Sequence, residues 1–82
     1  MVEVARMHRL DSDSSLKAFV DVIVAEQVLV KGVKVVKNRD GDIFVAMPKQ
    51  QGKDGKWYET VMLLNEDIKQ ELEEAVIEAY NV

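Results

Sequence analysis

The stretch Asp42-Ile43-Phe44-Val45-Ala46-Met47-Pro48 decides the fold class of this chain. Successive side chains of a strand point to opposite faces of a sheet, so one face receives the isoleucine, valine and methionine and the other the phenylalanine and alanine. Both faces are apolar, which is typical of a strand that is covered on both sides. Pro48 has no N–H to donate to a neighbouring strand, so it ends the strand or marks a sheet edge.

Four other segments carry the alternation or the β-branched content that is typical of strands. They are residues 2–10, 16–24, 28–36 and 57–63. The clearest is 16–24, where every second residue is aliphatic. The sequence therefore predicts about five strands.

Irregular positions and turn residues separate and modify these strands. Ala5 and Met7 interrupt the simple alternation of the first one, and Gly32 predicts a bulge or bend in the third. Asn38-Arg39-Asp40-Gly41 and Asp54-Gly55 supply the residue types that tight reversals need. Strands joined by short turns predict mostly antiparallel pairing.

The last segment predicts one helix of about fifteen residues. Asn65 is a favourable N-cap, and Glu66 and Asp67 place negative charge where the helix dipole favours it. Apolar residues then recur at helical spacing: Ile68, Leu72, Ala75, Val76, Ala79 and Tyr80. We expect this stripe to pack on one face of the sheet and the opposite, acidic face to meet water.

These segments predict an α+β fold in which residues 1–82 form one domain: a twisted, mostly antiparallel sheet with one C-terminal helix. One helix covers only one face of a sheet that is apolar on both. A chain of this size buries only about 60% of its unfolded surface, and it has no cysteine to form a disulfide. We therefore expect a second copy of the chain to cover the other face, giving a homodimer.

Hydropathy and charge narrow the classes of function. The apolar runs are far too short for a membrane span and no signal-peptide pattern opens the sequence, so we expect a cytoplasmic protein without membrane contact. The net charge is −4, but residues 31–56 carry seven basic and three acidic side chains, whereas residues 66–82 carry one basic and six acidic ones. The molecule is thus polarised into a basic and an acidic part.

Catalysis and metal binding have few candidate residues. His8 is the only histidine, and without cysteine a nucleophile–histidine pair would have to be built on it. A metal site of His8 with Asp11 and Asp13 is an alternative, but this spacing matches no familiar metal motif. No glycine-rich stretch both follows a strand and opens a helix, as a phosphate loop requires. We expect no enzymatic activity, no cofactor and no metal.

The best functional candidate is the segment 49–58, which combines lysines, amides and two aromatic residues. The ammonium groups of Lys49, Lys53 and Lys56 suit a phosphate backbone, and Trp57 and Tyr58 could stack on a base or ribose. The alternative from the residues alone is a solvated hairpin loop whose lysines serve solubility. On that interpretation the Trp57 ring belongs to the core or to a dimer interface.

One string and its surroundings point to a known family. Ile43-Phe44-Val45-Ala46-Met47-Pro48, followed by the lysine-rich loop around Asp54-Gly55, by Asn65 and by residues 75–80, resembles the stage V sporulation protein G (SpoVG) family. With looser alignment the resemblance covers nearly the whole chain.

The resemblance implies a non-enzymatic regulator of cell septation and sporulation, in a family whose members form dimers by pairing or exchanging strands. Several members bind DNA or RNA, and the basic residues implicated fall here at Lys49, Lys53, Lys56 and Lys69. Other regulatory proteins are further possible partners. The alternative function is a protein–protein adaptor that uses the acidic helix face and binds no nucleic acid.

Overall fold

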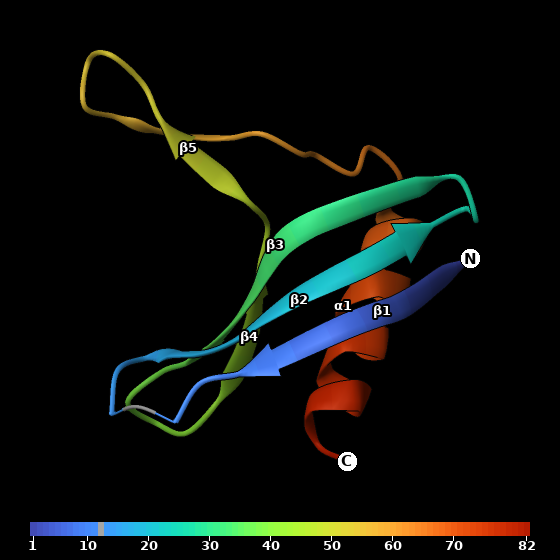
Figure 1. Cartoon of the computed structure of the whole chain (residues 1–82), viewed down its shortest axis with the longest axis horizontal. Coiled ribbons are helices and arrows are strands. Elements are labelled where there is room, and N and C mark those ends of the chain that lie inside the picture. The colour runs from blue at the N-terminus through green and yellow to red at the C-terminus, as the bar shows by residue number, and fades with distance from the viewer. Residues whose placement is uncertain (12) are drawn as a thin grey trace.

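A computed structural model describes residues 1–11 and 13–82. Its main sheet has four antiparallel strands that neighbour one another in chain order (Figure 1). They are β1 (Val2–Arg9), β2 (Leu16–Val24), β3 (Val28–Lys37) and β4 (Ile43–Ala46). A second, two-stranded antiparallel sheet pairs β5 (Lys49–Gln51) with β6 (Trp57–Glu59), and α1 (Glu66–Tyr80) ends the chain. The α+β fold with a C-terminal helix is therefore confirmed.

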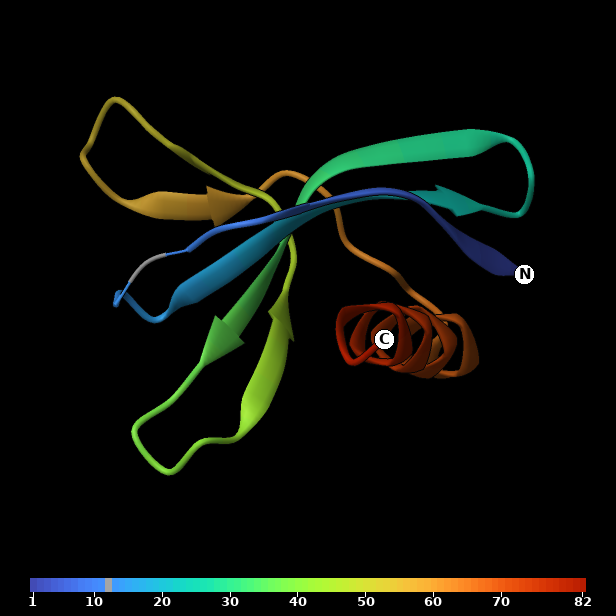
Figure 2. The same ribbon diagram turned by 60° about the horizontal axis from the view of Figure 1, so that its bottom comes forward.

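The core lies between one face of the main sheet and the helix. Figure 2 shows the helix end-on against that face, with β4 curling alongside it. The fully buried side chains are the alternating aliphatic residues of the two central strands and the middle of the helical stripe: Ala18, Val20, Val22, Val33, Val35, Leu72 and Val76. Close-packed β-branched residues on the sheet and two aliphatic residues on the helix thus form the interior.

Bulges explain the irregular positions in the strand pattern. The pairing of β1 with β2 shifts between Val4 and Arg6, so Ala5 is the extra residue that breaks the alternation. The pairing of β2 with β3 shifts next to Gly32, whose φ is +86°, a value that glycine adopts without strain. Beyond this shift β4 pairs only with the last four residues of β3. The predicted bulge at Gly32 is confirmed.

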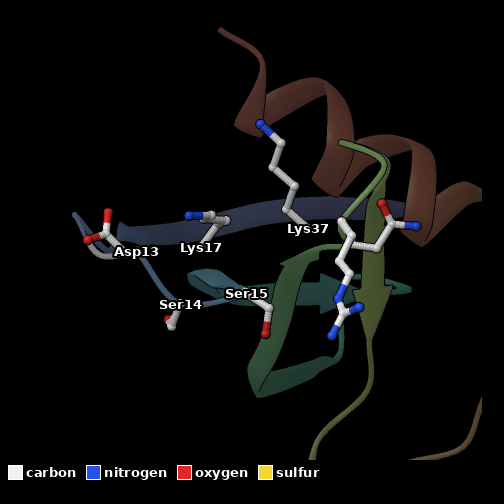
Figure 3. A pocket seen from close by; sticks show the side chains of 7 residues that line it. Asp13, Ser14, Ser15, Lys17 and Lys37 are labelled. Carbon is white, nitrogen blue, oxygen red and sulfur yellow. The ribbon is translucent and has the colours of Figure 1, made fainter.

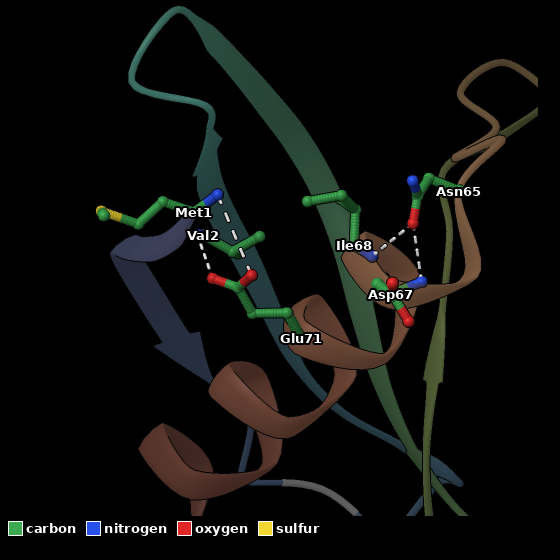
Figure 4. A network of polar contacts seen from close by, with 6 residues as sticks. All are labelled: Met1, Val2, Asn65, Asp67, Ile68 and Glu71. Carbon is green, nitrogen blue, oxygen red and sulfur yellow. Dashed lines mark hydrogen bonds and ion pairs between the residues drawn. The ribbon is translucent and has the colours of Figure 1, made fainter.

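The helix is fixed to its surroundings at both ends. Asn65 accepts hydrogen bonds at Oδ1 from the N–H groups of Asp67 (2.8 Å) and Ile68 (3.3 Å), so the predicted N-cap is confirmed (Figure 4). In the next turn the Glu71 carboxylate accepts a hydrogen bond of 2.7 Å from the Val2 N–H. These contacts place the start of the helix beside the first strand.

Arg9 holds the other end of the helix. Its guanidinium donates hydrogen bonds of 3.1 Å to the carbonyl oxygens of Ala79 and Val82. The guanidinium carbon also lies 4.9 Å from the centre of the Tyr80 ring. The last turn of the helix has no basic residue of its own, so Arg9 supplies the positive charge that the helix dipole favours there.

Two expectations about the strands are wrong. The segment 57–63 is a strand only as far as Glu59, and it pairs with residues 49–51, which the sequence predicted as loop. The main sheet offers no neighbour to residues 60–63, because β4 has already ended at Ala46. Residues 61–63 are all apolar, but without a partner strand residues 60–63 do not form part of a sheet.

Two aromatic side chains that the sequence assigns to covered positions are exposed within the single chain, and their cover by a second copy stays a prediction. The Phe44 side chain is 51% exposed, because the helix covers only the opposite face of β4. Trp57 is 62% exposed, because its strand belongs to the small second sheet and not to the core.

Candidate functional site

Residues 49–59, hereafter the arm, form a hairpin that reaches out from the main sheet (Figures 1 and 2). Its strands pair Lys49 with Glu59 and Gln51 with Trp57. Pro48 precedes the arm and accepts a hydrogen bond of 3.0 Å at its carbonyl oxygen from the N–H of Thr60. The proline thus separates β4 from the arm, as expected of a residue that cannot donate to a ladder.

The tip of the arm is a hydrogen-bonded turn around Gly55, whose φ of +83° confirms the predicted reversal. Gly52 donates a backbone hydrogen bond of 2.8 Å to Lys56 and accepts one of 3.1 Å from Gly55. Asp54 accepts at Oδ1 from the Lys56 N–H (3.0 Å) and at Oδ2 from the Tyr58 hydroxyl (2.6 Å). The Tyr58 hydroxyl therefore helps to hold the tip together, while the side chain remains 52% exposed.

The hydrogen bond between Tyr58 and Asp54 shifts the pKa values of the two groups in opposite directions. The Tyr58 hydroxyl, with help from the Lys56 N–H, lowers the pKa of Asp54 below 3.8. The same bond, from the other side, raises the pKa of Tyr58 above 10.0. Asp54 thus remains ionised at neutral pH and sets one negative charge among the lysines of the tip.

Trp57 is the more exposed of the two aromatic residues of the arm. It is 62% exposed and lies directly after Lys56. An exposed indole next to an ammonium group on a projecting hairpin combines a stacking surface with a phosphate contact. The sequence left this ring open as a stacking surface or as part of the core or of a dimer interface, and the placement in the core is wrong, because the second sheet was not foreseen.

The structure divides the four predicted site lysines into two groups. Lys49 and Lys69 line one hollow of about 220 Å³, together with Glu59 and Glu73 and with residues 45–47. The other two belong to the arm's tip and do not line this hollow. Two lysines are therefore brought together, but in the company of two carboxylates that weaken their combined attraction for an anion.

Sequence analysis missed the two carboxylates. The spacing of Lys69 and Glu73, four residues apart on a helix, was visible in the sequence and places them on one face. The proximity of Glu59 to Lys49 follows only from the pairing of β5 with β6.

The face of the main sheet turned away from the helix, hereafter the outer face, carries large apolar side chains. Phe44 is paired across the strands with Val36, and Leu29 with Ile23, so each pair shares a face. Phe44 and Leu29 are each 51% exposed, and Phe19 on the same face is 37% exposed. The outer face therefore leaves large apolar side chains uncovered in the single chain, with His8 and Lys34 paired to Phe19 on the same face.

A second apolar stretch leads into the helix. Met62 is 67% and Leu64 is 92% exposed in the segment between the arm and the N-cap. The acidic first turn of the helix follows at once, with Glu66 and Asp67. An apolar strip thus borders the acidic part of the molecule.

The described residues, 1–11 and 13–82, contain no group of three histidine, cysteine or acidic side chains placed to hold a metal ion. His8 lies in β1 and Asp11 and Asp13 lie in the loop that follows. Across the same part of the chain, no helix combines the length and hydropathy that crossing a bilayer would need.

Comparisons with known proteins place the chain among its relatives. A family model described as SpoVG matches residues 1–82. A Macrococcus caseolyticus (strain JCSC5402) protein named "Putative septation protein SpoVG" is 32% identical over 76 residues, which are 93% of this chain and 65% of that protein. A protein of the same name from Staphylococcus aureus (strain JH9) is 29% identical over 76 residues, covering 93% and 75% of the two chains. The chain thus spans about two thirds of the length of the first relative and three quarters of the second.

Proposed function

The chain belongs to the SpoVG family, and from this premise we propose that it is a non-enzymatic regulator of septation that binds single-stranded DNA or RNA through its arm. The septation part of the proposal is supported by the name of the relatives, "Putative septation protein SpoVG". The observation that carries the nucleic-acid part is the exposed Trp57 beside Lys56 on a hairpin that reaches out from the main sheet.

Single strands suit the arm better than a duplex. Stacking on Trp57 needs a base that is free of its own stack, and the lysines add phosphate contacts without sequence preference. Lys53 and Lys56 make the principal contacts, with Lys49 and Lys69 at the base of the arm. Glu59 and Glu73 weaken that base, so binding should be moderate and strongly salt-dependent.

A homodimer is the second part of the proposal. A second copy covers the outer face, because Phe19, Leu29 and Phe44 would otherwise leave large apolar side chains in water. A chain this short also has a small core, so burial of further apolar surface in a dimer would stabilise it. Two arms in one assembly would double the lysines available to a strand.

Trp57 makes a direct experiment possible, since it is the only tryptophan of the chain. We expect single-stranded RNA or DNA to quench its fluorescence at low salt. Each phosphate contact should contribute about −0.7 to the slope of log K on log salt for a single strand. The Lys49→Ala, Lys53→Ala and Lys56→Ala changes made together should abolish binding and flatten that slope.

Two controls show whether the arm is responsible. Lys31→Ala removes an exposed β3 lysine remote in sequence from the arm and should leave binding nearly unchanged. Glu73→Lys with Glu74→Lys should strengthen non-specific binding by easing repulsion. A triple variant that binds as well as the parent would show that the arm is not the site.

The alternative function is a protein–protein adaptor, and one observation favours it. The exposed Met62 and Leu64 beside the acidic start of the helix form an apolar strip with an acidic border, which suits the docking of a basic partner. If neither single-stranded RNA nor DNA quenched the Trp57 fluorescence at low salt, the proposed nucleic-acid binding would be contradicted and the adaptor function would take its place.

A further inference from the structure

We propose that the arm selects guanine among the bases of a single strand, with Trp57 stacking on the base and the Glu59 carboxylate binding its Watson–Crick edge. This inference rests on the proposed binding of single-stranded nucleic acid by the arm and adds to it the identity of one base. The residues concerned lie in β5 and β6, all of whose residues are exposed.

Four side chains share one face of the arm, because every second residue of a strand points to the same side and residues paired across two strands share a face. The pairing of β5 with β6 sets Gln51 opposite Trp57 and Lys49 opposite Glu59. Trp57 and Glu59 are two residues apart along β6, a separation of about 6.5 Å at the usual rise of a strand. A stacking ring and a carboxylate are therefore neighbours on one surface.

Hydrogen-bond acceptors surround the Trp57 ring on this face. The Glu59 side chain has neither a hydrogen bond nor an ion pair among the residues that the structure describes. Gln51 donates through Nε2 to the Gly55 carbonyl oxygen (3.1 Å), which leaves its Oε1 as an acceptor. A base stacked on the indole thus meets two acceptor groups, and the ammonium of Lys49 suits a phosphate of the same strand.

Guanine is the base whose Watson–Crick edge fits a carboxylate. Its N1–H and N2–H groups are adjacent donors, so the two oxygens of one carboxylate can accept from both. Adenine and cytosine offer a single amino group beside a ring nitrogen that repels a carboxylate, and uracil offers one N–H between two carbonyl oxygens. The half-width of a stacked base plus one hydrogen bond of about 2.8 Å also matches the spacing of Trp57 and Glu59 along β6.

The two carboxylates at the base of the arm differ in what they can do. Glu59 and Glu73 line the same hollow, and both weaken the attraction of Lys49 and Lys69 for phosphates. Glu73 lies on α1, whereas Glu59 shares a face of the arm with Trp57. Removing either charge should therefore ease repulsion, but removing Glu59 should also remove the contact with the base.

The larger hollow at the loop end of the main sheet offers no comparable surface. It measures about 260 Å³ and lies between the β1–β2 loop and the β3–β4 loop (Figure 3). Its cationic groups do not converge on one point, and none of the described residues that line it is aromatic: Asp13, Ser14, Ser15, Lys17, Lys37, Asn38 and Arg39. A base would find no ring to stack on there, which leaves the arm as the place of guanine recognition.

Short fluorophore-labelled oligouridines with one variable central base test the preference by fluorescence anisotropy at low salt. We expect a central guanine to bind about fivefold tighter than a central adenine, cytosine or uracil, because charge-assisted hydrogen bonds are added. Central inosine keeps N1–H but lacks the amino group, so it should lose most of this gain. Equal affinities for the four bases would overturn the inference and leave the proposed nucleic-acid binding in place, whereas binding of none of these strands would contradict both.

Two matched variants separate the base contact from the effect of charge. Glu59→Gln removes the carboxylate with little change in size, so it should strengthen binding of the all-uridine strand and lose the preference for guanine. Glu73→Gln should strengthen binding of every strand to the same extent and keep the preference. A Glu59→Gln variant that still prefers guanine, or an inosine strand bound as tightly as the guanine strand, would overturn the proposal.

Discussion

At the scale of single residues, the hydrogen bond between Tyr58 and Asp54 makes the order of the arm dependent on pH. The folded-state pKa of Asp54 is lowered, so its stabilising effect is present above pH 3.8 and is lost as the pH falls through the folded value. The folded-state pKa of Tyr58 is raised, so its effect is present below pH 10.0 and is lost as the pH rises through the folded value. The arm should be most ordered between these limits.

Tyr58→Phe removes the hydroxyl and nothing else. We expect the midpoint of Asp54 titration, read from its carboxyl ¹³C shift, to move upward toward its ordinary value in this variant. Tyr80→Phe, which removes a tyrosine hydroxyl outside the arm, serves as the control. An unchanged Asp54 midpoint would show that the hydrogen bond is not formed in solution.

The turn between β2 and β3 contains two residues in an unfavourable backbone conformation. Ala25 and Glu26 have φ values of 55° and 60°, a region that glycine enters more readily than residues with a Cβ atom. Glu26→Gly should therefore raise the free energy of unfolding by up to about 1 kcal/mol, measured by urea denaturation.

Gly55→Ala is the matched change in the opposite direction. Gly55 has a φ of +83° and no atom within 4 Å of an added Cβ, so only backbone strain opposes the substitution. We expect the arm to lose order in this variant.

A destabilised Glu26→Gly protein would mean that the glutamate side chain does more in the β2–β3 turn than its backbone suggests.

At the scale of elements, the clearest prediction concerns the cap of α1. Asn65→Ala removes the acceptor for two N–H groups and should lower the free energy of unfolding by about 1 kcal/mol. Asn81→Ala is a fitting control, because Asn81 caps the other end through its backbone N–H and not its side chain. Equal losses in the two variants would contradict the role of the Asn65 side chain.

Elements with a long apolar pattern could be predicted from the sequence, and so could the turn of the arm, but the first strand of the arm could not. The stripe of β2 and the stripe of α1 each repeat several times, so burial and secondary structure agree along them. The residues of Lys49–Gln51 are all polar, so they show no alternation of apolar and polar positions. Their pairing with Trp57–Glu59 depends on the turn between the two strands. The lysines of the candidate site were found by charge, but their carboxylate neighbours depend on this pairing.

At the scale of the whole molecule, the exposed apolar side chains of the outer face are the basis of the proposed homodimer. We expect sedimentation at micromolar concentration to show twice the mass of 9.3 kDa. Phe44→Asp should shift the protein toward monomers, because a buried carboxylate in the interface would lose its water. Glu26→Gln, in the β2–β3 turn, should not. A stable, folded monomer of the parent chain would contradict the proposed homodimer.

Arg9 also bears on the order in which the chain folds. The strands of the main sheet contact their neighbours in sequence, whereas the hydrogen bonds from Arg9 and to Glu71 each close a loop of about seventy residues. Since closing long loops is entropically unfavourable, we expect the β1–β4 meander to assemble in the transition state and the helix to dock afterwards. Arg9→Ala should then accelerate unfolding in stopped-flow experiments while leaving the refolding rate nearly unchanged.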